Sequence, residues 1–146
     1  MWKARIQFYW TQRFPARSAV RVRHTYRPFV GGSYITTGMD GASNIRPYCG
    51  GPETLTEIQR VKLRRPRKDA ETVLLERNVQ YILTTANNWN GPIHNFHLTV
   101  TADDPEDIVL TCMPGLERTS PTRYELSRTD FHPDRELDLL ILQAAR

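Results

Sequence analysis

Short runs in which apolar and polar side chains alternate recur along the chain, with turn-forming residues between them. Between residues 93 and 101, for example, Phe96, Leu98 and Val100 fall on one side of an extended segment. A period of two residues is typical of a β-strand that buries one face. Comparable runs cover residues 2–11, 20–27, 72–85, 108–112, 124–126 and 137–142. Six to eight short strands, with turn signals about every ten residues, predict a mainly β fold, an antiparallel β-sandwich.

The order of the runs predicts how some of them pair. The link around Pro15 is short, so residues 2–11 and 20–27 are expected to form an antiparallel hairpin. The run 137–142 is apolar on both sides, which predicts a central strand. Residues 31–51 hold no period for long and predict a long loop, with room for one short strand near residues 34–37. Loops of this length usually carry function or are pinned by a crosslink.

One short helix is predicted over residues 52–63. Thr54, followed three residues later by Glu57, matches a capping box. Leu55, Ile58 and Val61 recur at helical spacing beyond it. The basic residues 64–68 then end the helix and form a charged connector.

The length and composition fit one domain spanning residues 1–146, with a mass of 16.9 kDa. Hydrophobic residues at 39% exclude a disordered chain, and no apolar run approaches the roughly 20 residues of a membrane-spanning helix. The first residues lack the apolar run of a secretory signal, and alternation already begins at Trp2. We therefore expect the C-terminal portion of a longer protein.

The net charge of +4 averages two unlike halves, since residues 1–73 carry +9 and residues 74–146 carry −5. We favour halves that face each other in one fold over a basic half that attracts nucleic acid or anionic lipid. The basic tract at residues 60–68 is the best phosphate-binding candidate. No aromatic residue interleaves with it to stack a base, so a solvated helix end is favoured and nucleic-acid binding is disfavoured.

The sequence shows no catalytic residue, metal site or cofactor site. It has no Gly-x-Ser-x-Gly elbow, no nucleotide-binding glycine pattern and no Cys-x-x-Cys pair. His94 and His97 would point to opposite faces of a strand, which disfavours a shared metal ion, and His24 is expected to pack at the edge of the core. The acidic residues 103–107 flank Pro105 and are interpreted as a solvated turn.

Cys49 and Cys112 lie 63 positions apart and leave two interpretations open. They form one disulfide that pins the long loop, or they are two unrelated reduced thiols. A thiolate from either cysteine, paired with a histidine, is the alternative that would make the protein a hydrolase or transferase.

The densest polar-aromatic cluster consists of Asn87, Asn88, Trp89 and Asn90, in a turn between two well-patterned strands. An exposed Trp beside amides suits a glycan or a protein ligand, because it offers a flat apolar face next to donors and acceptors. The competing interpretation, which we favour, is that Trp89 folds back as a plug over the end of the sandwich and the asparagines supply turn hydrogen bonds.

Residues 81–93 resemble a bacterial family, the domain of unknown function 4424, and the resemblance continues through residues 96–100, Cys112, residues 120–122 and 130–133, and 137–142. It covers most of the chain and is weakest over residues 38–45 and 61–73. The chain departs from the family where we expect a glycine near Ala86. The resemblance implies export to the periplasm or beyond, a longer protein with a preceding β-rich half, and a Cys49–Cys112 disulfide. It supplies no catalytic residues, because the family has no established activity.

Together these observations predict a non-enzymatic exported domain without a membrane span. We expect it to bind or assemble with protein or glycan through its loops and sheet edges. The oligomeric state is left open.

Overall fold

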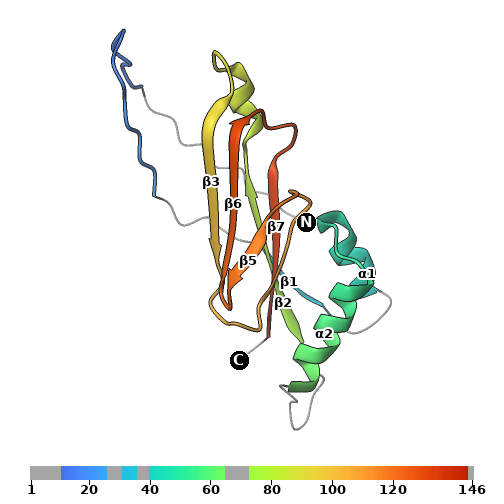
Figure 1. Ribbon diagram of the computed structural model, residues 1–146. Coiled ribbons are helices and arrows are strands. Elements are labelled where there is room, and N and C mark those ends of the chain that lie inside the picture. The colour runs from blue at the N-terminus through green and yellow to red at the C-terminus, as the bar shows by residue number, and fades with distance from the viewer. Residues whose placement is uncertain (1–10, 26–30, 36–39, 65–72, 145–146) are drawn as a thin grey trace.

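The computed structural model describes residues 11–25, 31–35, 40–64 and 73–144, and within these ranges the fold is mainly β (Figure 1). A four-stranded antiparallel sheet has the order β1 (Gly31–Ile35), β2 (Leu74–Tyr81), β7 (Leu137–Ala144), β4 (Ile108–Leu110). A three-stranded antiparallel sheet has the order β3 (Ile93–Thr101), β6 (Arg123–Phe131), β5 (Glu117–Ser120). The predicted mainly β sandwich is confirmed.

The two sheets pack face to face over one apolar core. The alternation along β3 and β6 turns Val100, Tyr124 and Leu126 inward, where they are less than one-tenth exposed. They meet Leu137 and Leu139 of β7, so each sheet buries the face that its period of two predicts.

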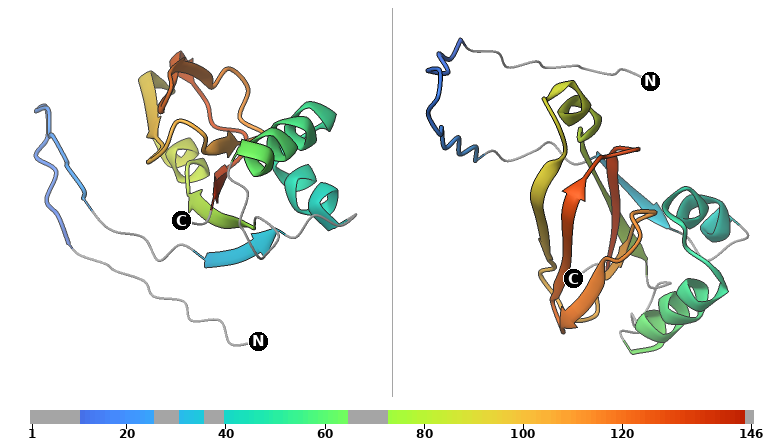
Figure 2. Two further views of the ribbon diagram at one scale, coloured as in Figure 1. Left: turned by 90° about the horizontal axis from the view of Figure 1, so that it is seen from below. Right: turned by 45° about the horizontal axis from the view of Figure 1, so that its top comes forward.

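Strand β7 is the central strand of the molecule, as its apolar residues on both sides predict. Leu139 faces the three-stranded sheet, whereas Leu140 belongs to a second core cluster on the opposite face of the four-stranded sheet. That second cluster joins helix residues to strand residues: Ile45, Ile58, Val61, Leu74, Ile108, Leu140 and Leu142. Helices α1 (Asp40–Ile45) and α2 (Pro52–Arg64) thus cover this face, and the fold has three layers, helices, sheet and sheet (Figure 2).

Helix α2 confirms the predicted helix but begins differently from the predicted capping box. Pro52 is its first residue, and the Gly51 N–H donates to the Thr54 hydroxyl oxygen at 3.4 Å. Thr54 therefore lies in the first turn and receives the cap hydrogen bond, so it is not itself the N-cap. The proline explains the difference, because its fixed φ and missing N–H suit the first helical position.

Residues 31–51 contain more structure than the predicted long loop. They hold β1, α1 and the 3-10 helix η1 (Arg46–Tyr48), and Ile45 is 1% exposed. Gly50 follows in close contact, since a Cβ there would lie 2.8 Å from the Ile45 Cβ. Ile45 anchors this segment in the core, and elements this short leave no periodic pattern to recognise.

The predicted N-terminal hairpin is only partly within the described residues. Residues 2–10 lie outside them, and residues 20–25 are exposed and do not form a strand, so that part of the prediction is wrong. Strand β5 was missed because all four of its residues are exposed and show no apolar alternation.

Candidate functional site

The connection between β2 and β3 carries the predicted ligand-binding residues Asn87, Asn88, Trp89 and Asn90. It forms the 3-10 helix η2 (Thr84–Asn88), in which the Ala86 and Trp89 N–H groups donate to the Leu83 and Ala86 carbonyl oxygens at 3.0 Å. Leu83 and Ala86 are buried, whereas Trp89 is 66% exposed. The plug interpretation is therefore wrong, because Leu83 and Ala86 already fill the end of the sandwich.

The neighbouring connection between β6 and β7 holds both ends of η2. At its start, the Leu83 and Thr84 N–H groups donate to the Glu136 carboxylate at 2.5 and 3.1 Å, and the Thr84 hydroxyl donates to the same group. At its end, the Asn87 Nδ2 donates to the Pro133 carbonyl oxygen at 2.9 Å. Trp89 is thus presented on a loop that is held by the Glu136 carboxylate and the Pro133 carbonyl oxygen, 46 to 53 positions away.

The bonds to Glu136 predict a pH dependence of stability. Hydrogen bonds from the Thr84 hydroxyl, and then from the Leu83 and Thr84 amides, lower the pKa of the Glu136 carboxyl below its ordinary 4.5. An acid with a lowered pKa in the fold contributes stability above its unfolded pKa and loses it as the pH falls through the folded pKa. Glu136→Gln is expected to melt below the wild type at pH 7, with the difference shrinking below pH 4.5 in melting curves. Glu117→Gln is the control, because Glu117 is an exposed residue of β5. A melting-temperature difference between Glu136→Gln and the wild type that stays constant down to acid pH would contradict the stabilising role of the ionised Glu136.

An arm formed by residues 11–25 stands on the side of β3 that faces away from β6 (Figures 1 and 2). Its residues are all exposed, and its apolar side chains include Phe14 at 64% and Val22 at 43%. The arm and Trp89 border an open hollow of 770 Å³, and all of its lining residues are exposed. The hollow is lined by Thr11, Gln12, Phe14, Val20, Val22, His24 and Trp89. His24 is exposed there, so the prediction that it packs at the edge of the core is wrong.

The two histidines of β3 have separate partners. His94 Nδ1 lies 2.8 Å from an Asp130 carboxylate oxygen, and His97 Nδ1 lies 2.9 Å from the Ser127 Oγ. Among the described residues, no group of three or more His, Cys, Asp or Glu side chains is placed to hold a metal ion. The sequence prediction missed the Ser127 contact because only the register of β3 on β6 brings residues 97 and 127 together.

His97 also has a carboxylate neighbour, since its Nε2 lies 3.6 Å from a Glu125 oxygen. A serine, a histidine and an acid in a row are the groups of many acyl-transfer enzymes. Here the imidazole is 56% exposed on the outer face of a sheet, where water reaches the groups freely. The row is better explained as a cross-strand polar network.

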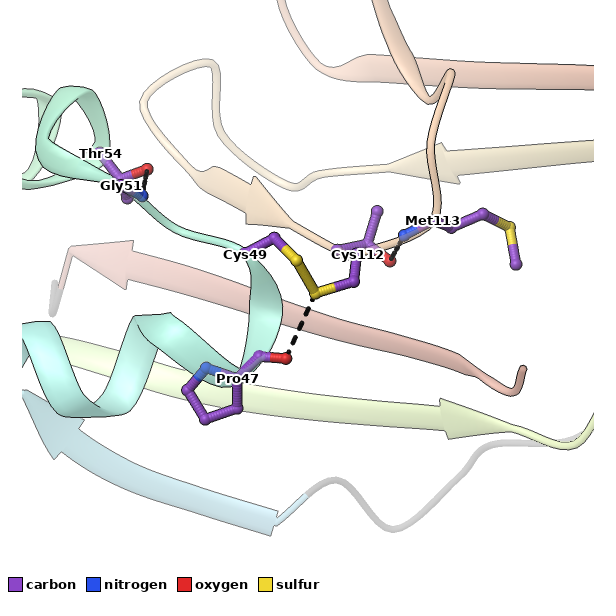
Figure 3. The surroundings of a disulfide bond; sticks show 7 residues. Pro47, Cys49, Gly51, Thr54, Cys112 and Met113 are labelled. Atoms are coloured by element: carbon purple, nitrogen blue, oxygen red, sulfur yellow. Dashed lines mark hydrogen bonds between the residues drawn. A yellow bond between two sulfur atoms is a disulfide. The ribbon is translucent and has the colours of Figure 1, made fainter. Parts of the chain in front are cut away.

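Cys49 and Cys112 form a disulfide, with their Cα atoms 5.1 Å apart (Figure 3). Cys49 ends η1 in the left-handed region, at φ 59°, and its N–H donates to the Arg46 carbonyl oxygen at 3.1 Å. The bond ties the chain between α1 and α2 to the segment that follows β4. Because the sequence has only these two cysteines, neither supplies the thiolate that the hydrolase alternative requires.

The predicted basic tract is divided by the fold. Residues 60–64 end α2, where Lys62 is buried and Arg64 pairs with Glu106 at 3.5 Å. Residues 65–68 lie outside the described residues. The described part of the tract therefore presents Arg60 and Arg64 to solvent but not Lys62.

The acidic turn at residues 103–107 differs from the solvated turn that the sequence predicts. Asp107 is 4% exposed and accepts hydrogen bonds from the Asp104 N–H at 3.1 Å and the Gln143 Nε2 at 3.2 Å. Its burial raises the pKa of the carboxyl. Asp107 thus fastens the turn to β7 as a structural residue.

A comparison with protein families shows to which family the chain belongs. The model of a family described as "Domain of unknown function (DUF4424)" matches residues 1–140. The chain belongs to this family. The Trp89 loop, the disulfide and both sheets of this DUF4424 chain lie almost entirely within the matched residues. No curated protein and no solved structure matches it. Among the described residues, no helix is long and apolar enough to cross a membrane.

Proposed function

We propose that this protein is a non-enzymatic binding domain that recognises a carbohydrate through the surface formed by Asn87, Asn88, Trp89 and Asn90. The observation that carries the proposal is the exposure of Trp89, at 66%, on a loop that Glu136 and Pro133 hold in place. A large aromatic face left in water on a fixed support suits ligand stacking, because little conformational freedom is lost when the ligand binds.

The neighbouring side chains favour a sugar over a purely apolar ligand. Asn88 and Asn90 are exposed on either side of Trp89, and each amide offers both donors and an acceptor. Asn87 already donates to Pro133 and so contributes more to the shape of the loop. A pyranose ring combines an apolar face with hydroxyl groups at its rim, which complements a tryptophan flanked by amides.

The hollow beside Trp89 supplies room for such a ligand. Its volume of 770 Å³ is large enough for a short saccharide, and its lining mixes apolar Phe14 and Val22 with polar Gln12. We propose that the arm contributes to the site from the side opposite Trp89.

Trp89→Ala is expected to weaken retention of the protein on the polysaccharides or glycan arrays that bind the wild type by about 30-fold or more. Removing an aromatic anchor from a binding surface typically costs about 2 kcal/mol or more, which corresponds to that factor. The measurement is the dissociation constant by calorimetry, or by array titration, with circular dichroism to show that the fold is kept.

Leu63→Ala is the matched control, since Leu63 is 79% exposed on α2, away from the η2 end of the sandwich in Figure 1. It removes exposed apolar surface outside the proposed site and should leave binding unchanged. Binding that survives Trp89→Ala, or a protein that retains no glycan, would exclude the proposal.

We further propose that the protein acts outside the cytoplasm, in the periplasm of a bacterium or in a secreted form, as a single domain. The disulfide supports this location, because cytosolic thiols are kept reduced. Alkylation of thiols in freshly lysed producing cells should then leave both Cys49 and Cys112 unmodified until a reductant is added; two labelled thiols before reduction would contradict export.

A further inference from the structure

Strand β3 forms the one long edge of the two described sheets. It has nine residues and pairs with β6 along one side, whereas the other edge strands β1, β4 and β5 have five, three and four. Within the described residues, no strand pairs with its second side. A long edge leaves a row of main-chain donors and acceptors ready to pair with another strand.

The sequence of β3 lacks the features that normally protect such an edge. It contains no Lys, Arg, Asp, Glu or Pro, and its pairing with β6 shows no register shift. By contrast, β5 carries Glu117 and Arg118, and its pairing with β6 shifts between Arg118 and Ser120. Charges, bulges and shortness discourage edge-to-edge pairing, and β3 alone among the four described edges has none of them.

We propose that β3 pairs antiparallel with β3 of a second copy, about a two-fold axis at residue 97, and so forms a homodimer with a continuous six-stranded sheet. In this register residues 93–101 of one copy face residues 101–93 of the other. Residue 97 faces itself, Asn95 faces Thr99, and Phe96 faces Leu98. On the core side Phe96 meets Leu98, and on the outer side Asn95 meets Thr99, so the pairs next to the axis match in polarity. The outermost pairs are mixed, since His94 faces Val100 and Ile93 faces Thr101.

A second copy fits this edge better than a charged peptide does. Two uncharged strands meet without repulsion although each chain carries +4, and a two-fold axis at the centre of β3 uses all nine residues of both strands. Phe96 and Leu98, both half-buried, would be covered further by their counterparts.

The test is sedimentation equilibrium of the full chain with charges placed on β3. The wild type should approach twice the 16.9 kDa chain mass as its concentration rises. Asn95→Lys with Thr99→Lys puts like charges opposite each other and should weaken dimerisation at least tenfold, as should Asn95→Glu with Thr99→Glu. An equimolar mixture of the two double variants should form a heterodimer, because Lys then faces Glu at both positions.

Two controls separate this edge from other surfaces. Thr119→Lys with Thr129→Lys adds the same charge on β5 and β6, where both residues are exposed, and should leave the dimer intact. His97→Cys should form a disulfide between copies on oxidation, whereas Thr101→Cys should not, because residue 101 faces residue 93. A wild type that stays at the chain mass at all concentrations overturns the proposal, as does a dimer that the Lys and Glu variants leave unchanged.

Discussion

Removing the disulfide is expected to lower the melting temperature by about 10 °C or more. The bond closes a loop of 63 positions, and the chain-entropy model gives such a crosslink about 4 kcal/mol. In a domain of this size each kcal/mol shifts the melting temperature by about 2–4 °C. The variant is Cys49→Ala with Cys112→Ala, followed by calorimetry without reductant.

The fold predicts where that loss is felt first. Cys49 joins the segment between α1 and α2 to Cys112 after β4, so the bond holds the helical layer on the four-stranded sheet. Hydrogen exchange should speed up in α2 more than in β6. Reduced wild-type protein is the control and should melt close to the double variant. A melting temperature unchanged by both treatments would show that the helical layer does not depend on the crosslink.

Leu139→Ala and Leu140→Ala are each expected to cost about 2–5 kcal/mol of the free energy of unfolding. The two residues are neighbours in β7, are 5% and 1% exposed, and face opposite layers. Truncation leaves a cavity on one side of the central strand in either case. The measurement is urea unfolding followed by circular dichroism.

The comparison of these two variants tests the third layer directly. In a two-layer sandwich whose outer face met water, one of two neighbouring strand residues would be exposed. Truncating that residue would change the free energy of unfolding little. Equal losses are expected here because Ile45, Ile58 and Val61 cover the Leu140 face. Leu63→Ala on exposed α2 surface should cost less than about 0.5 kcal/mol. A loss for Leu140→Ala as small as that of Leu63→Ala would be incompatible with a helical layer packed on the sheet.

Only part of the candidate site could be predicted from the sequence. The amides and Trp89 stand together in the sequence, so their clustering needed no structure. The exposure of these side chains required the structure. The interpretation of Trp89 as a plug is excluded because Trp89 is exposed, whereas Leu83 and Ala86 are the buried residues of this connection. The anchoring by Glu136 could not be predicted, since it joins residues 52 and 53 positions apart.

The alternating runs by themselves determined the extended segments that became β2, β3, β4, β6 and β7, their buried faces, and the central place of β7. A period of two is a local property, and it survives in any arrangement that buries one face. Only the tertiary structure decided which strands pair, that no other described strand pairs with the second side of β3, and that residues 20–25, although patterned like a strand, stand exposed. Strand pairing and edge exposure depend on contacts between distant segments, and no local pattern specifies which partner a strand receives.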